Sequence, residues 1–438
     1  MNKPDNISYR WVVLVVAFIT LVLGYAIRNC FSVFYPTIVE EFGWQRGDTA
    51  LIFSISIIVY GLASPVAGSL VDRFSPRVIL PIGGVILGGG MALCSQATTQ
   101  LEFYFYYGVL VAVGLSLAGW TPLTTILSSW FVNNRGLPFG VMTAGFGGSL
   151  VYATLAQFLI STFGWKTAYI IIGGSAIAII VPLCALFMRR RHTRMDDSPK
   201  TATPSSVSSG NPKNSTAVEM PDNPKRTWTE ATWTLSRAIK TNQYWLLFFI
   251  GFCHLGIAEY IAIAHQVYFF LDAGYSPMLA ANIYSTFGIA FVLGTLFSFS
   301  SDRLGREIVF NTGCLLCTVA VFLLFFIKDP SRPWMGFLYA MLFGSGMGAA
   351  APVFFTTVAD LFMGRHFGSI QGTIIFGISL SGATSPWLGG FLHDKTGSYF
   401  STYLLMLGSL LLCILLMRLV APHEVRPVVK SQKRGAGD

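Results

Sequence analysis

Twelve apolar stretches dominate the sequence, and each is about long enough to cross a lipid bilayer as a helix. They cover approximately residues 11–35, 49–71, 78–97, 103–127, 137–161, 167–188, 243–270, 278–300, 307–327, 334–357, 367–391 and 399–420. The first is about 25 residues long and lacks an A-x-A-like cleavage site, so we expect a retained helix rather than a secretory signal. The sequence therefore predicts an all-α membrane protein with twelve transmembrane helices.

The low content of charged residues excludes most other classes of protein. Of 438 residues, 53% are hydrophobic and only 11% are charged, whereas soluble domains carry about 25% charged residues. The seven cysteines are an odd number, spread through apolar stretches without metal-ligand spacing. We therefore expect no disulfide scaffold, no metal and no cofactor. A Walker A motif is also missing from the sequence, and no nucleophile, base and orienting acid converge, so neither an ATP-driven pump nor an enzyme is favoured.

The distribution of Lys and Arg predicts the orientation of the chain. When the loops are assigned to alternate sides, 23 of the 29 basic residues fall on one side, together with both termini. Cytoplasmic loops collect Lys and Arg, so both termini are expected in the cytoplasm of a cell that carries the protein in its plasma or inner membrane. The net charge of +9 then reflects orientation and contact with anionic lipid heads, and not nucleic-acid binding.

A polar segment divides the chain into two halves. Residues 190–240 are rich in Ser, Thr, Pro, Asn and Lys and lack apolar periodicity, which predicts a flexible cytoplasmic linker. The expected organisation is a six-helix bundle over residues 1–189, the linker, a second bundle over 241–421 and a cytoplasmic tail over 422–438.

The two halves repeat each other weakly. The second stretch is followed by GSLVDRFSPR (68–77) and the eighth by SDRLGR (301–306), so that Asp72 and Asp302 lie 230 residues apart. Six plus six helices with weak internal symmetry are typical of a secondary transporter, whose site lies near the membrane midplane between the halves. A simple polar turn is the alternative interpretation of each copy.

These features resemble the major facilitator superfamily. GSLVDRFSPR is similar to its loop motif G-x-L-x-D-R-x-G-x-R, with Ser75 in place of a Gly. The resemblance implies that Asp72 caps a neighbouring helix and pairs with Arg, which locks one access state. It extends to a set of conformational-gate residues: Asp72, Arg73, Arg77, Arg135, Asp302, Arg303 and Arg306.

Three further stretches resemble the monocarboxylate transporter group and its bacterial relatives. They are GYAIRNCFSVF (24–34) leading to EFGW (41–44), WFVNNRG (130–136), and GFLHDKTGSY (390–399). The second is similar to W-F-x-x-R-R-G-L-A-x-G, although Asn134 replaces one Arg and Pro138 the Ala. His265 before DAGYS (272–276) also resembles a His near the end of the seventh helix in the bacterial relatives.

Arg28 is a basic residue deep inside an apolar stretch, about 17 residues into the first one. Tyr25, Arg28 and Ser32 follow at intervals of three and four residues, which is one helix face. An intramembrane cation is costly and is a functional candidate by default, and a guanidinium binds a carboxylate through two hydrogen bonds. The alternatives are that Arg28 extends to the outer interface or pairs with Glu259.

The seventh helix carries three ionisable residues: His254, Glu259 and His265. On an ideal α-helix His254 and His265 are about three turns apart on one stripe, and Glu259 is displaced from His254 by about 140°. Glu259 or His254 is predicted to carry a proton. A structural role, as a satisfied helix-end His or an ion-paired Glu, is an equal alternative for each.

The resemblance also has departures. Animal monocarboxylate transporters carry a Lys where Asn29 stands here, and an Asp and an Arg where Ala290 and Gly294 stand, so coupling through that pair is not available. The oxalate exchangers, a neighbouring group, use two intramembrane cations in later helices, which this chain lacks. One cation favours a monoanion over a dianion.

The sequence therefore predicts a secondary transporter that moves a small monocarboxylate, such as lactate or pyruvate, with a proton by alternating access. It is expected to act as a monomer in the lipid bilayer. An exchanger for a dicarboxylate or an aromatic acid, or a transporter-like membrane sensor, remains an alternative. The predicted substrate-binding residues are Arg28, Tyr25, Asn29, Ser32, Trp120, Thr124, His265, Tyr284 and Trp387, although Trp and Tyr in spans more often pack than bind.

Overall fold

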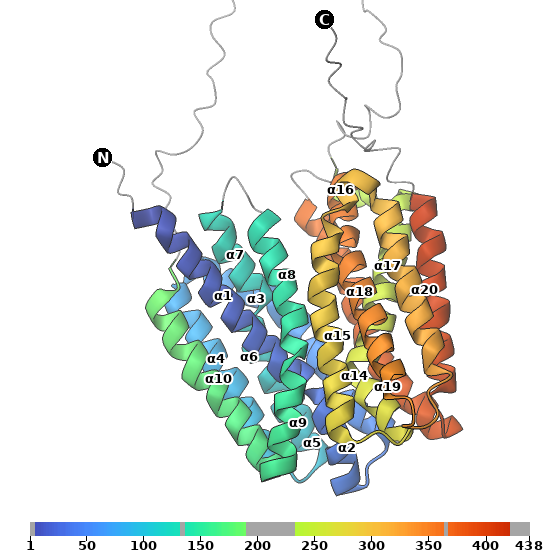
Figure 1. Ribbon diagram of the computed structural model, residues 1–438. Coiled ribbons are helices and arrows are strands. Elements are labelled where there is room, and N and C mark those ends of the chain that lie inside the picture. Colours follow the sequence, from blue (N-terminus) through green and yellow to red (C-terminus); the bar gives the residue numbers. More distant parts are fainter. Residues whose placement is uncertain (1–4, 132–135, 190–232, 363–366, 421–438) are drawn as a thin grey trace, which may run out of the picture.

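Two helical bundles lie side by side in the computed structural model, which describes residues 5–131, 136–189, 233–362 and 367–420 (Figure 1). The helices coloured blue to green form one bundle, and those coloured yellow to red form the other. All regular secondary structure in these ranges is helical. The arrangement confirms the predicted all-α architecture of two halves.

The first bundle is built from six spans, some of which consist of consecutive shorter helices. Its elements are α1 (Asp5–Asn29), α2 (Phe31–Phe42), α3 (Arg46–Arg73), α4 (Pro76–Leu93), η1 (Cys94–Gln96), α5 (Gln100–Phe103), η2 (Tyr104–Val111), α6 (Ala112–Ala118), α7 (Trp120–Trp130), α8 (Gly136–Leu150), α9 (Tyr152–Phe163) and α10 (Trp165–Phe187). The first span joins α1 to α2 and runs from Tyr9 to Phe42, beyond the end predicted from the apolar stretch.

The second bundle repeats the pattern of six spans. Its elements are α12 (Leu235–Ala238), α13 (Asn242–Gly251), η4 (Phe252–Glu259), α14 (Tyr260–Asp272), α15 (Pro277–Ser298), α16 (Ser301–Leu304), α17 (Arg306–Leu324), α18 (Pro333–Phe362), α19 (Phe367–Thr396) and α20 (Phe400–Val420). Across the described ranges, eleven helices are long and apolar enough to cross a membrane. The 30-residue α19, which is rich in Gly and Ser, completes the twelve.

Both ends of the described chain lie at the same end of the molecule. In Figure 1, α1 begins and α20 ends at the top, which we call the terminal end, and α2, α5 and α9 mark the opposite or distal end. The terminal end is the one that the charge distribution assigns to the cytoplasm, and this assignment stays a prediction. The linker prediction falls mostly on residues 190–232, outside the described residues, and the domain bounds also stay predictions.

The halves meet where α9 packs on α15 and α2 on α14, and most extensively along two helix pairs, α3 with α19 and α8 with α15. The two extensive contacts bring backbones close together. A Cβ on Gly390 would lie 2.8 Å from the Cα of Gly47, and a Cβ on Gly147 would lie 3.1 Å from the carbonyl oxygen of Gly288. Small residues permit this close approach of membrane helices. The seam between the bundles is therefore narrow, and side chains placed on it contact both halves.

Candidate functional site

The Arg28 guanidinium is buried at the seam, near the C-terminal end of α1. Arg28 is only 1% exposed, so its side chain does not extend to the outer interface. The guanidinium carbon lies 4.7 Å from the ring centroid of Tyr25, 5.5 Å from that of Tyr60 and 5.9 Å from that of Tyr260. Tyr25 and Tyr60 belong to the first half and Tyr260 to the second. Cation–π contacts from both halves therefore hold the charge.

Arg28 has no carboxylate partner among the described residues, because no described Asp or Glu oxygen lies within 4.0 Å of its nitrogens. Its Nε and Nη1 atoms are buried without a hydrogen-bond partner. Aromatic faces offset part of the cost of burying a cation, but they leave two N–H donors unsatisfied. An anion bound through two hydrogen bonds contacts either Nε with Nη2 or Nη1 with Nη2, so each of these edges of the guanidinium offers an unsatisfied donor.

The polar groups next to Arg28 are also partly unsatisfied. Asn29 donates through Nδ2 to the Ser149 hydroxyl at 2.9 Å, but its Oδ1 atom has no partner, and neither has the buried hydroxyl of Ser32. The helix of the first span is interrupted at Cys30, between α1 and α2. Tyr107 donates a hydrogen bond to the Arg28 carbonyl at 2.6 Å. Interrupted helices at the seam of two repeats are where transporters place polar sites.

Glu259 faces the same region from the second half. It is buried at 7% exposure, no described basic nitrogen lies within 4.0 Å of its carboxylate, and it directly precedes Tyr260, whose ring contacts the Arg28 guanidinium. The ion pair between Arg28 and Glu259, which was the alternative to a binding role for Arg28, is therefore not formed here. Each of the two groups lacks a direct counter-ion within the part of the chain that the structure describes.

The two histidines of the seventh span face different helices, which corrects the prediction of one common stripe. Residues 252–259 form the π-helical segment η4, so the α-helical angle between His254 and His265 does not apply. The His254 ring packs 5.3 Å from that of Phe310, and both of its nitrogens lack partners. His265, by contrast, contacts Tyr35 of the first half at 5.4 Å.

Both nitrogens of His265 are bonded within the second half. Nε2 lies 2.7 Å from the Pro386 carbonyl oxygen and Nδ1 lies 3.0 Å from the Tyr399 hydroxyl. A carbonyl oxygen can only accept, so Nε2 carries a hydrogen. These bonds tie α14 to the distal part of α19 and to the turn between α19 and α20. His265 is thus occupied in a structural contact in this state, although it lies at the seam.

The other predicted substrate-binding residues are placed in three ways. Tyr284 bridges the halves, with its hydroxyl 3.4 Å from the Asn29 carbonyl oxygen and 3.2 Å from that of Ile263. Thr124 donates to the Trp120 carbonyl at 2.8 Å, and both side chains are half-buried in α7. Trp387 is 37% exposed and stacks on Phe391. Among the contacts of the described residues, none joins Trp387 to Arg28 or to the three tyrosines around it.

The gate motif of the second half forms a charged network near the terminal end. Arg306 donates through Nη2 to Asp302 at 2.7 Å and through Nε to Asp360 at 3.1 Å. Arg303 and Arg73 are exposed, and Arg77 donates to the Leu186 carbonyl at 2.8 Å. Of the predicted gate residues, Arg135 and the side chain of Asp72 lie outside the described part of the chain.

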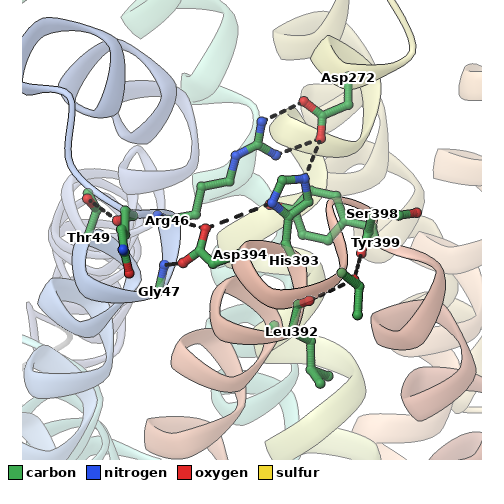
Figure 2. Close-up of polar contacts among 12 residues, drawn as sticks. Arg46, Gly47, Thr49, Asp272, Leu392, His393, Asp394, Ser398 and Tyr399 are labelled. Carbon is green, nitrogen blue, oxygen red and sulfur yellow. Dashed lines mark hydrogen bonds and ion pairs between the residues drawn. The ribbon is translucent and has the colours of Figure 1, made fainter.

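A second charged network joins the halves at the distal end, and the sequence did not predict it (Figure 2). Arg46, the first residue of α3, donates two hydrogen bonds to Asp272 of α14, at 2.6 and 2.8 Å. Its guanidinium lies 4.0 Å from the Tyr268 ring centroid. His393 is 3.6 Å from Asp272. Asp272 and His393 both belong to stretches that resemble the family, but nothing in the sequence indicated their partner.

Two repeated bundles with a buried, unpaired cation at their seam define a secondary transporter rather than an enzyme. The sequence model of one protein family, the Major Facilitator Superfamily, matches residues 16–298 and 271–437 of this chain. The chain therefore belongs to this superfamily, and it is a multi-pass membrane protein.

Named relatives and solved structures agree with this assignment. The chain is 26% identical to Monocarboxylate transporter 13 of Rattus norvegicus over 99% of its own length and 94% of the relative's. It is 25% identical to Monocarboxylate transporter 2 of Homo sapiens, over 92% and 84% of the two lengths. A bacterial homolog of the human lysosomal transporter Spinster, solved in an inward-facing and unoccupied conformation, shares the fold with a TM-score of 0.64 at 16% identity, over 97% of both chains.

Proposed function

We propose that this protein transports a small monocarboxylate across the membrane by alternating access, and that Arg28 binds the carboxylate group. The observation that carries the proposal is the pair of buried, unpartnered donors on Arg28 at the seam. A carboxylate that accepts from Nη2 and from one of these donors would be held through two hydrogen bonds. The names of the relatives support the same substrate class.

The charge at the site favours a monoanion. Arg28 is the one buried Lys or Arg among the residues that the structure describes. A second carboxylate on the substrate would have to be buried beside Glu259 without a cation, which is strongly unfavourable. Lactate and pyruvate are small acids of the required charge.

Glu259 is the group that we propose to carry the proton. A substrate anion on Arg28 adds a negative charge close to Glu259, so anion binding is favoured when Glu259 takes up a proton. This linkage would couple one proton to one carboxylate. His254 is the less favoured carrier, since its unpartnered ring packs against Phe310 in the core of the second half.

The test uses proteoliposomes that contain a pH-sensitive dye and are exposed to lactate or pyruvate. The parent protein is expected to acidify the lumen as it takes up the acid. Glu259→Gln should abolish acidification but retain exchange of labelled for unlabelled acid, whereas Glu40→Gln, at an exposed position of α2, should behave like the parent. Absence of any monocarboxylate uptake by the parent would refute the substrate class. Undiminished acidification by Glu259→Gln would refute the role of Glu259.

A further inference from the structure

The first turn of α3 lacks a cap from its own sequence. Gln45 occupies the N-cap position and makes no side-chain hydrogen bond to the helix. The first N–H groups of a helix need acceptors from elsewhere, and a carboxylate is the most favourable acceptor because it also interacts with the helix dipole. The residue that supplies this acceptor comes from the other half of the protein.

Asp394, near the end of α19, caps α3 across the seam (Figure 2). Its Oδ1 accepts from the Arg46 backbone N–H at 3.2 Å and its Oδ2 from the Gly47 N–H at 2.6 Å. Gly47 leaves room for this contact because it has no side chain. A Cβ at this position would lie 3.1 Å from the Asp394 carboxylate. A helix cap is usually local in sequence, but here residues 46 and 394 belong to different halves.

The same end of α3 is held by a second, independent contact. The Arg46 side chain pairs with Asp272 of α14, and the Arg46 carbonyl accepts from the Tyr35 hydroxyl at 2.6 Å. Two helices of the second half therefore bind Arg46: α19 binds its backbone N–H through Asp394, and α14 binds its side chain through Asp272. We call Arg46, Gly47, Asp272 and Asp394 the distal latch.

We propose that the cap which Asp394 provides for α3 sets the balance between the two access states, because it forms only when the distal end is closed. Opening the distal end separates α3 from α19 and returns two N–H groups and a carboxylate to water. The ion pair of Arg46 with Asp272 opens in the same movement. The inference rests on the proposed alternating access, but it requires no particular substrate.

Distance measurements between spin labels in lipid nanodiscs test this proposal without any ligand. Labels are placed on Glu41→Cys in the first half and Lys328→Cys in the second, both exposed at the distal end. The seven native cysteines are buried, so labelling is expected at the two introduced positions. Opening of the distal end lengthens the distance between the labels, and the distribution reports the populations of the two states.

Asp329 provides a matched control for Asp394. It also accepts a backbone N–H through its carboxylate, from Ser331 at 2.8 Å, but both residues belong to one exposed loop at the distal end. Hydrogen bonds from Ser331 hold the pKa of this carboxyl below its usual range, so it is ionised at neutral pH. Asp329→Asn therefore removes a similar charge and acceptor without touching the seam.

Asp394→Ala is expected to raise the ratio of long to short distances about tenfold, which corresponds to about 1.4 kcal/mol. Asp394→Asn, which keeps the volume and one acceptor, should give a smaller increase, and Asp329→Asn none. In an Arg46→Gln background the backbone donors remain, so Asp394→Ala should still raise the ratio. An unchanged distribution for Asp394→Ala, an equal change for Asp329→Asn, or no further change in the Arg46→Gln background would each overturn the proposal. Failure to bind any monocarboxylate would refute the proposed function and leave this result intact.

Discussion

Replacement of Arg28 by Met separates a ligand-binding role from a structural role, because the two predict opposite effects on the protein without ligand. Met has a similar length and is apolar. In the structure Arg28 is 1% exposed and leaves two donors unsatisfied. Removing a buried charge without a counter-ion should not lower stability, whereas breaking a buried ion pair costs about 3–5 kcal/mol. We therefore expect Arg28→Met to unfold at the temperature of the parent or above it.

The expected loss of affinity follows from the two donors. A hydrogen bond to a charged group contributes about 1.5–3 kcal/mol, and truncation of one partner of a buried charge pair costs about 2–5 kcal/mol. For two bonds to one carboxylate we expect a loss of about 3–5 kcal/mol, which weakens binding between about 100-fold and about 4,000-fold. Arg28→Lys keeps the charge but not the paired donors, and should lose less affinity than Arg28→Met.

The assay is thermal unfolding of the purified protein with and without a panel of mono- and dicarboxylates. A ligand at 100 times its dissociation constant stabilises the state that it binds by about 2.7 kcal/mol. That stabilisation should fall to about 0.4 kcal/mol or less in Arg28→Met, and it should persist in Arg418→Met, which removes an exposed arginine of α20. Full ligand stabilisation of Arg28→Met would refute the binding role, and a large fall in its ligand-free unfolding temperature would show that Arg28 holds the fold.

Three further changes test packing that the sequence does not reveal. Gly294→Ala places a methyl group against the Ser345 carbonyl oxygen, where α15 crosses α18, and should lower the free energy of unfolding by about 1–3 kcal/mol. Gly408→Ala meets no atom within 4 Å and should raise it by about 0.4–1 kcal/mol; equal effects of the two would contradict the crossing. His265→Ala leaves the Pro386 carbonyl without its donor and should lower the same quantity by about 1–3 kcal/mol, so an unchanged melting curve would argue against this contact.

The fold could be predicted from the sequence because bilayer thickness sets the length of every span. Hydropathy located the first span, but not its end. The span continues through Pro36 to Phe42, and its polar last turn, with Glu40 and Glu41 exposed, falls outside an apolar stretch. The π-helical segment η4 could not be predicted either. It has no signature in apolar periodicity, and it changes which way His254 faces relative to His265.

The candidate site was predictable only in its local part. A spacing of three residues indicated that Tyr25 shares a helix face with Arg28, and its ring does contact the guanidinium. Tyr60 and Tyr260 come from α3 and α14, and periodicity within one helix carries no information about them. The distal latch was missed for the same reason, since Arg46 and Asp394 are 348 residues apart and meet only after the two halves pack.

The Arg28 site and the distal latch are coupled by one helix in the mechanism that we propose. Tyr260 and Tyr268 of α14 lie over Arg28 and Arg46, respectively, and eight residues of helix separate them by about 12 Å. A movement of α14 away from the first half removes both rings together. Without substrate, that movement strips the buried Arg28 of a cation–π contact and leaves its charge uncompensated. A carboxylate on Arg28 supplies the compensating charge, so the movement of α14 costs less free energy when the substrate is bound. A ligand shifts a conformational equilibrium only through such a difference in interaction between the two states, and here the difference arises at the residue that would bind the substrate.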